Sequence, residues 1–335
     1  MIYRVLFPFS ESEVTALAFD MLPLTSTNVL RLISLKLNQA LFFCCLCLLT
    51  GCGSGSPPIS MSGFIELVEA ANHSSFDRVG QYVDNDGVRR TKVSYTVDGL
   101  KQYALLLSSI AKAPAGGRPL LLLNHGFHSD PLSYGQIDGR NARPGAYYWD
   151  YAQAYAKRGY MVVIADYRGH SDSEQQVFGL ADRLLNWYSF KMHEFYKPAY
   201  WYTRDVIGAY FAAVKLDGIN PEQVYMVGHS MGGGITQRSI LALGNRINAA
   251  SIWSTSKGHQ EVEPYWPSLD VPLLIQHGEG DESTDVVYST TLAGILEFRG
   301  KEHQLVIVDT NEHLFEGKHF DDAIERDINW FSSHR

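Results

Sequence analysis

Residues 224–234 read VYMVGHSMGGG, and this stretch decides the fold. Four apolar, β-prone residues precede a serine that has a glycine two positions before it and another two positions after it. A helix-forming run, Ile235 to Leu243, comes next. This order is typical of a strand, a sharp turn and a helix, with Ser230 at the apex of the turn. Glycines are needed on both sides because strand and helix pack closely there. The stretch therefore predicts that Ser230 is a nucleophile held clear of its strand.

A serine hydroxyl attacks only when a base takes its proton and an acid orients that base. After a turn of this kind, the acid and the histidine follow the serine along the chain. Asp281 comes shortly after the apolar strand 272–276, in a glycine-bearing loop, and His313 follows the strand 304–308. Both lie past the carboxyl ends of expected strands, where α/β sheets place their sites. Ser230, Asp281 and His313 are therefore the predicted catalytic residues.

Other acids and histidines have plainer interpretations. The rival acids are Glu279, Glu282 and Asp285. Asp285 is the most serious rival, but it opens an expected helix and would serve as its N-cap. His229 is next to the nucleophile, and its side chain is expected to point away from the hydroxyl. No histidines form a metal-binding pattern such as H-E-x-x-H, so neither a metal nor another cofactor is expected.

The tetrahedral intermediate of acyl transfer carries an oxyanion, which needs hydrogen-bond donors. One donor is expected to be the backbone N–H of Met231, at the start of the helix that follows the nucleophile. The other is expected from the loop after the strand 120–124. Gly126 lets the chain turn there, so that the N–H of Phe127 can point to the site.

Together these pieces resemble the α/β-hydrolase fold superfamily. The resemblance is greatest to its compact branch of carboxylesterases, dienelactone-hydrolase-like enzymes and catalytic domains of prolyl-oligopeptidase-type peptidases. It covers roughly residues 88–335 and is carried by the segments 125–127, 166–171 and 220–233 together with Asp281 and His313. It implies a serine hydrolase with a Ser-His-Asp triad, and it does not identify the substrate. One departure is Ser171, where many relatives carry a glycine, so this loop is expected to differ in shape.

The remaining pattern alternates strands and helices. A hairpin is expected from 88–97, the turn pair Asp98-Gly99 and 100–108. Strands are expected near 120–124, 161–165, 224–228, 249–253, 273–277 and 304–308, and helices near 64–71, 146–158, 199–216, 230–243, 286–298 and 319–332. This alternation predicts an α/β fold of three layers, with a mostly parallel twisted sheet, an antiparallel N-terminal hairpin and helices on both faces. Residues 61–335 are expected to form this single domain.

The N-terminal part indicates where the protein works. Leu41 to Thr50 is an apolar run too short to span a bilayer, and basic residues precede it. The run ends at Leu49-Thr50-Gly51-Cys52, which resembles a bacterial lipobox. Residues 1–51 are therefore expected to be an N-terminal extension and lipoprotein signal peptide. Cys52 would carry acyl chains such as palmitate, and residues 52–60 would be a flexible tether. The expected location is the cell envelope, lipid-anchored in the outer membrane or facing the periplasm.

The net charge and the aromatic residues bear on which molecules the protein can bind. The chain has 28 basic and 36 acidic residues, a net charge of −8, which gives no electrostatic case for nucleic-acid binding. An aromatic cap insertion is expected over 171–198, and packing is its favoured role over ligand binding.

Three classes of function remain open: a carboxylesterase, an oligopeptidase-type serine peptidase, and a non-catalytic binding relative. A peptidase would need an anchor for a peptide terminus, and the loop acids available are Glu194, Glu261 and Glu263. The oligomeric state is left open.

Overall fold

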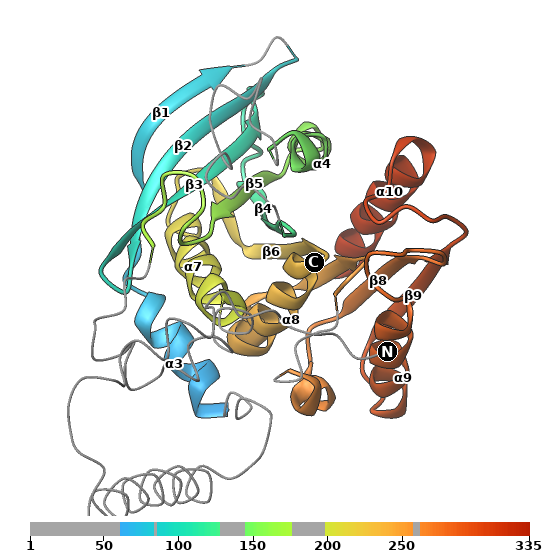
Figure 1. Cartoon of the computed structure of the whole chain (residues 1–335). Helices are drawn as coiled ribbons and strands as arrows, with labels where there is room; N and C mark the ends of the chain where they lie inside the picture. The colour runs from blue at the N-terminus through green and yellow to red at the C-terminus, as the bar shows by residue number, and fades with distance from the viewer. Residues whose placement is uncertain (1–60, 84–85, 128–144, 176–197, 257–261) are drawn as a thin grey trace, which may run out of the picture. The chain divides into compact units, whose positions relative to one another are not determined.

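A computed structural model describes residues 61–83, 86–127, 145–175, 198–256 and 262–335 (Figure 1). These residues form a nine-stranded sheet with the order β1-β2-β3-β5-β4-β6-β7-β8-β9. The strands are β1 (Asp77–Val83), β2 (Val88–Val97), β3 (Leu100–Ser109), β4 (Arg118–Asn124), β5 (Met161–Asp166), β6 (Ile219–His229), β7 (Ala249–Trp253), β8 (Leu273–Gly278) and β9 (His303–Val308). The expected signal peptide, Cys52, the tether and most of the cap insertion lie outside the described residues.

The sheet is antiparallel at its N-terminal end and parallel elsewhere. β1, β2, β3 and β5 pair antiparallel, and the strands from β5 through β4 to β9 pair parallel. The β2–β3 hairpin turns at Asp98 and Gly99, whose φ angles are 56° and 76°. Two positive φ values match the type I′ turn that Asp-Gly favours. The predicted hairpin is confirmed, and so is the mostly parallel sheet.

Two elements differ from the expectation. The sequence predicts no strand over Asp77–Val83, yet β1 forms the edge of the sheet beside β2. None of its described side chains is buried, so it has no hydrophobic periodicity that could mark it in the sequence. β6 begins five residues earlier than expected, because Ile219 and Asn220 pair with β4 before a register shift.

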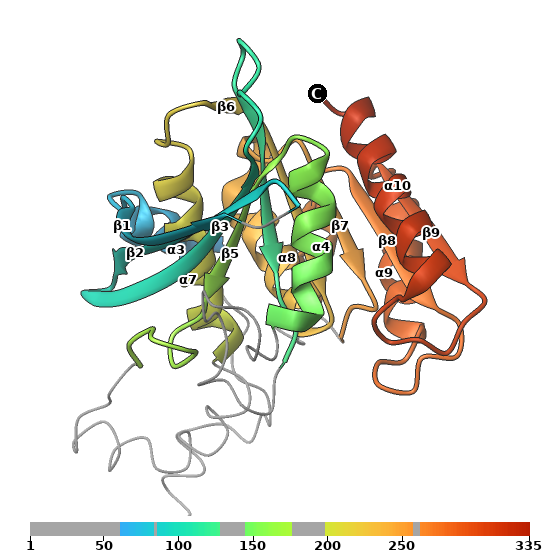
Figure 2. The same cartoon turned by 90° about the horizontal axis from the view of Figure 1, so that it is seen from above.

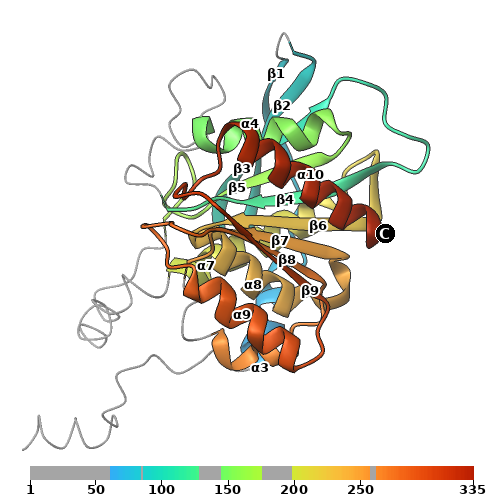
Figure 3. The ribbon, with the colours of Figure 1, turned by 90° about the vertical axis from the view of Figure 1, so that its right-hand side faces the viewer.

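Helices cover both faces of the sheet (Figures 2 and 3). They are α3 (Met61–Ala71), α4 (Gly145–Lys157), α7 (Pro198–Ala213), α8 (Met231–Leu243), α9 (Val287–Phe298) and α10 (Gly317–Ser333). The buried side chains of α3, α7, α8 and α9 belong to one hydrophobic cluster, and those of α4 and α10 belong to the other. This is the three-layer arrangement expected from the sequence. Within the described parts of the chain, no helix combines the length and apolar character needed to cross a membrane.

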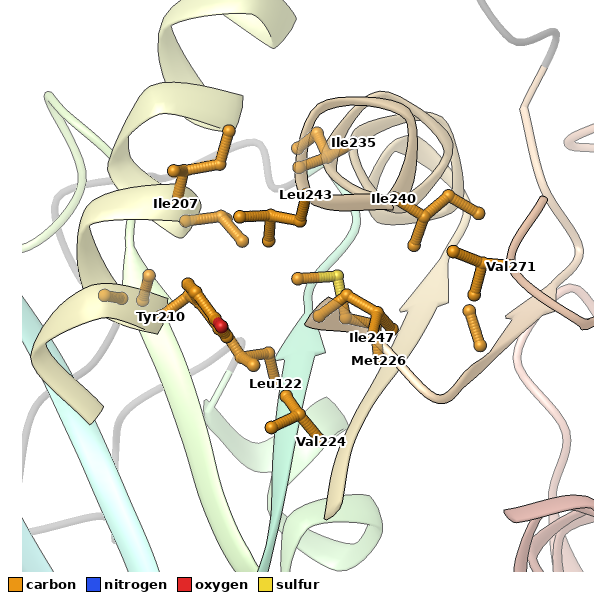
Figure 4. Packing of buried hydrophobic residues seen from close by; sticks show 14 of the residues in the cluster. Leu122, Ile207, Tyr210, Val224, Met226, Ile235, Ile240, Leu243, Ile247 and Val271 are labelled. Carbon is orange, nitrogen blue, oxygen red and sulfur yellow. The ribbon is translucent and has the colours of Figure 1, made fainter. Parts of the chain in front are cut away.

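The four consecutive leucines of β4 explain how one strand serves two cores. Leu120 and Leu122 pack in the cluster of α7 and α8, while Leu121 and Leu123 pack in the cluster of α4 and α10. Successive side chains of a strand point to opposite faces, so a strand covered on both sides reads as a continuous apolar run. Figure 4 shows the first cluster, where side chains from α7 and α8 lie over β4 and β6. Each such side chain stabilises the fold by about 1.5–3 kcal/mol through burial.

A polar group is buried in the second cluster. Asp327 of α10 is fully buried and accepts hydrogen bonds from Trp253 Nε1 at 3.0 Å and Gln276 Nε2 at 2.7 Å. The hydroxyl of Tyr155, on α4, also donates to Asp327. Burial raises the pKa of Asp327 to about 7, although hydrogen bonds from Ser251, Tyr155 and Trp253 oppose the rise. Asp327 therefore ties α10 to α4, β7 and β8.

Candidate active site

The turn between β6 and α8 holds Ser230 in an unusual backbone conformation. Its φ is 55° and its ψ is −122°, a combination that side-chain-bearing residues rarely adopt. Its N–H donates to Trp253 O at 3.0 Å, and its carbonyl accepts from Gly233 N at 2.9 Å and from Ser256 N at 3.2 Å. Backbone strain of this kind costs about 1–3 kcal/mol and persists only where the surroundings enforce it. The fold thus holds this serine rigidly at the end of a central strand.

The glycines flanking Ser230 are required by the packing of strand against helix. A Cβ on Gly228 would lie 2.2 Å from Thr236 Oγ1, and a Cβ on Gly232 would lie 2.0 Å from the backbone oxygen of Asn124. Real Cβ atoms do not approach other atoms so closely. The G-x-S-x-G spacing is therefore a steric requirement of this turn.

Asp281 and His313 meet beyond the ends of β8 and β9. His313 Nδ1 lies 2.7 Å from Asp281 Oδ2, and the carboxylate has no exposed surface. Asp281 Oδ1 accepts from the backbone N–H of Ser283 at 2.8 Å and of Thr284 at 3.0 Å. Burial favours the neutral acid, but the hydrogen bonds from His313 and Thr284 outweigh it and hold the pKa of Asp281 below its usual value. An ionised Asp281 accepts the Nδ1 proton of His313 and leaves Nε2 free to act as a base.

The rival acids do not take this place. Glu279, Glu282 and Asp285 are exposed, whereas Asp281 is buried. Asp285 Oδ1 accepts from the backbone N–H of Val287 at 2.9 Å, at the first residue of α9. Asp285 therefore bonds to the start of α9 from one position before the N-cap, which is Val286 and not Asp285 as the sequence predicts.

The loop that carries His313 is tied to the serine turn. Nε2 of His229, the residue before the nucleophile, lies 2.8 Å from the backbone oxygen of His313, and the two imidazole rings are 4.6 Å apart. The His313 side chain remains 27% exposed, so a substrate can reach it. Ser230, Asp281 and His313 thus lie at three separate strand ends, with Asp281 bonded to the His313 ring and His229, the neighbour of Ser230, bonded to the His313 backbone.

The residues expected to supply the oxyanion donors are Met231, which follows Ser230 in the chain, and Phe127, which follows Gly126. Met231 is the first residue of α8, where backbone N–H groups have no acceptor within the helix. Across the site, a Cβ built on Gly126 would lie 3.1 Å from Ser230 Cβ, so the loop after β4 passes close to the nucleophile. Phe127 follows in that loop, with its side chain 77% exposed. Phe127 and Met231 thus follow the carboxyl ends of β4 and β6, the same edge of the sheet as Ser230.

Several side chains near the site have structural roles. The His125 ring stacks on Tyr167 with centroids 3.8 Å apart, and its Nδ1 lies 2.9 Å from Gly126 O. His277 Nε2 lies 3.0 Å from Thr284 O, and burial lowers the pKa of His277. Ser171 adopts a φ of 49°. Ser171 thus has a backbone conformation that glycine adopts more readily than residues with a side chain.

Some of the residues predicted from the sequence lie outside the described residues. Glu194, Glu261 and the aromatic residues of the insertion lie there, and Glu263 opens a short 3-10 helix. The described residues contain no group of three or more His, Cys, Asp or Glu placed to hold a metal ion.

Two residues at the site could not be identified from the sequence. Thr284 Oγ1 lies 2.9 Å from Asp281 Oδ2 and 3.0 Å from Ser254 O. Tyr148 Oη lies 2.7 Å from His229 Nδ1 and 2.7 Å from Gly126 N. Tyr148 stands in the aromatic run Tyr147 to Trp149, for which packing is the favoured role. No sequence motif indicates that Tyr148 or Thr284 forms hydrogen bonds at the site.

Comparisons with known proteins agree with this geometry. Residues 119–255 match a family described as the alpha/beta hydrolase fold. An acetyl xylan esterase from a Paenibacillus species has a similar structure, with a TM-score of 0.58 and 14% identity over 84% of this chain and 97% of that one. An acetyl xylan esterase from a Thermoanaerobacterium species matches with a TM-score of 0.54 and 13% sequence identity. The match covers 84% of this chain and 95% of that one. Dipeptidyl peptidase 4 of Porphyromonas gingivalis matches with a TM-score of 0.51 and 14% sequence identity. The match covers 78% of this chain but only 43% of the peptidase.

A search among curated proteins finds no match to the sequence. The strand order, the turn at the end of β6 and the family match nevertheless agree with one another. The chain has the α/β-hydrolase fold.

Proposed function

We propose that this protein is a serine hydrolase that cleaves carboxylic esters through an acyl-enzyme. One observation carries the proposal: the hydrogen bond of 2.7 Å between Asp281 and His313, on a loop that is bonded to the residue preceding a strained Ser230. This arrangement supplies a nucleophile, a base and an orienting acid in the roles that acyl transfer needs.

The chemistry follows from these positions. Ser230 Oγ attacks the ester carbonyl carbon while His313 Nε2 takes the hydroxyl proton. The oxyanion is held by the N–H groups of Phe127 and Met231. The C–O bond to the alcohol then breaks, and His313 returns the proton to the leaving alcohol. Water attacks the acyl-enzyme with the same base, which releases the acid and restores Ser230. Asp281 stabilises the imidazolium in both halves of the cycle.

Esters are favoured over peptides by the extent of the structural likeness. The two acetyl xylan esterases match this chain over nearly their whole length, whereas the peptidase of Porphyromonas gingivalis matches over less than half of its own. A simple ester needs no anchor for a peptide terminus. We therefore place short peptides second, as the alternative substrate class.

The deciding experiment is an activity comparison with a matched variant. p-Nitrophenyl esters of graded acyl length and aminoacyl nitroanilides are offered to the wild-type protein and to Ser230→Ala. We expect ester turnover in the wild type, loss of at least about 10³-fold in the variant, and labelling of Ser230 alone by a fluorophosphonate. Cleavage of nitroanilides in preference to esters makes the protein a peptidase. Equal turnover in the two proteins, or labelling of a different serine, refutes the nucleophile.

We further propose that the catalytic domain is held at the cell envelope by acyl chains on Cys52. The sequence features that support this are the short apolar run 41–50, the lipobox-like residues before Cys52 and the glycine-serine segment after it. Such a tether lets the domain stand off a membrane and meet soluble esters.

A further inference from the structure

A chain of hydrogen bonds runs through His229, the residue before Ser230, and connects the loops that carry Gly126 and His313. It runs from the backbone N–H of Gly126 to the Tyr148 hydroxyl, from there to His229, and on to the backbone oxygen of His313. The distances are 2.7 Å, 2.7 Å and 2.8 Å. Tyr148 and His229 are only 5% and 4% exposed, so solvent does not compete for these bonds.

The direction of every bond in this chain is fixed. The backbone oxygen of His313 can only accept, so His229 Nε2 carries a proton and donates it. Burial and then the neighbouring His313 lower the pKa of His229 to about 3, which leaves its Nδ1 without a proton. Nδ1 therefore accepts from the Tyr148 hydroxyl. The Tyr148 oxygen in turn accepts from the N–H of Gly126.

This order has a consequence for the oxyanion site. Because the N–H of Gly126 is bound to Tyr148, the peptide plane before Gly126 is held in one orientation. The next N–H along the chain is that of Phe127, the proposed oxyanion donor. The position of this donor relative to Ser230 thus depends on where the Tyr148 hydroxyl lies. The space around Gly126 is also filled, since a Cβ there would lie 2.6 Å from Tyr148 Oη and 3.2 Å from His229 Nδ1.

We infer that Tyr148 and His229 are positioning residues that align the oxyanion donor of Phe127 with the nucleophile and with the base loop. The inference rests on the proposed function. Neither side chain exchanges a proton with the substrate in this scheme. They act by holding the Gly126 amide, the serine turn and the His313 backbone in one rigid frame, and preorganised donors of this kind contribute most when the oxyanion forms.

The test compares two tyrosine variants that lose the same atom. Tyr148→Phe keeps the ring but leaves Gly126 N and His229 Nδ1 without their partner. Tyr95→Phe is the matched control, because the Tyr95 hydroxyl is also buried and donates to a backbone oxygen, that of Asp205, at 3.0 Å. We expect Tyr148→Phe to lower kcat about 10- to 100-fold with KM changed less than about twofold, and Tyr95→Phe to keep both.

A second measurement separates alignment from general loosening. Phenylboronic acid forms a tetrahedral adduct with a catalytic serine and places an oxygen where the oxyanion forms. Its inhibition constant should rise in Tyr148→Phe by about the factor that kcat loses, while circular dichroism shows the fold intact. An unchanged inhibition constant overturns the inference, and so does a kcat equal to that of Tyr95→Phe.

A variant of His229, the hydrogen-bond partner of Tyr148, completes the test. His229→Gln keeps an N–H for the His313 carbonyl but removes the ring nitrogen that accepts from Tyr148. If the two residues act as one unit, the double variant should be no slower than the slower single variant by more than about threefold. If the fold losses of kcat in the two single variants multiply in the double variant, the two residues act separately and the shared role is refuted. His229→Gln also decides the matter if Tyr148→Phe does not fold, since it must then show the same loss of kcat and boronate affinity. A wild-type protein without esterase activity would defeat the proposed function itself, a result distinct from each of these.

Discussion

Asp281 and Asp285 stand four residues apart in one loop, and their side chains have different partners. Asp281 is buried against His313, and Asp285 is exposed and bonded to the first turn of α9. Asp281→Asn removes the charge that stabilises the His313 imidazolium, so we expect kcat to fall about 10⁴-fold. Asp285→Asn should cost at most about 0.5–2 kcal/mol of unfolding free energy and keep kcat. Steady-state kinetics and urea unfolding of both variants measure this. A larger kcat loss in Asp285→Asn would assign the acid to that residue.

His229 should make the fold sensitive to acid. Its pKa is about 3 in the fold because of burial and the nearby His313, against 6.5 for an ordinary histidine. The stability that neutral His229 contributes is therefore present above about pH 6.5 and is lost as the pH falls toward 3. The whole effect is on the order of 5 kcal/mol. In His229→Gln, the unfolding free energy should fall less steeply over this range than in the wild type.

Chemical unfolding at a series of pH values measures this slope. His319→Gln is the control, because His319 is half-buried and bonded to Glu312 at the surface. It should follow the wild-type curve. Parallel curves for His229→Gln and the wild type would mean that His229 is not the neutral buried group described here.

At the scale of an element, the turn between β6 and α8 should tolerate no side chain at Gly232. A Cβ there meets the backbone of Asn124, which cannot move without shifting β4. Gly232→Ala should therefore cost about 1–3 kcal/mol or more and remove activity by displacing the N–H of Met231. Gly294→Ala is the matched change in exposed α9, where nothing lies within 4 Å, and it should stabilise the protein by about 0.5–1 kcal/mol. Thermal unfolding compares them, and equal melting temperatures would contradict the steric argument.

Most elements could be predicted because their signals are local. The β2–β3 hairpin follows from the Asp98-Gly99 pair, and the elbow follows from its glycines. Asp281 could be singled out because it follows a buried strand in a glycine-bearing loop. Tyr148 could not, since its role depends on a contact with His229, 81 positions away, and an aromatic helix residue is usually packing. β1 could not be predicted for a different reason: it is an edge strand that buries no described side chain, so its sequence has no hydrophobic alternation.

At the scale of the whole molecule, the mature protein should begin at a lipid-bearing Cys52. Each buried CH₂ contributes about 0.8 kcal/mol, so one acyl chain holds a protein only marginally and stable attachment needs several. We expect the native protein to partition into detergent. Cys52→Ser should yield an uncleaved precursor or soluble protein, with esterase activity unchanged. Mass spectrometry of the N-terminal peptide measures the modification directly. An unmodified peptide that begins elsewhere would make this a secreted hydrolase and would leave the active site as described.

The buried hydrogen bonds of Asp327 can form only after helix α10 has been synthesised and has docked on the sheet. Helix α10 follows every strand of the sheet along the chain, so it is synthesised after all of them. Until it docks, Trp253 and Gln276 have polar groups facing the core without the carboxylate that accepts from them. Trp253 also supplies the carbonyl that fixes the N–H of Ser230. Until α10 docks, Trp253 lacks one of the bonds that hold its side chain beside the serine turn, so we expect hydrolysis to begin only once α10 has packed against the sheet.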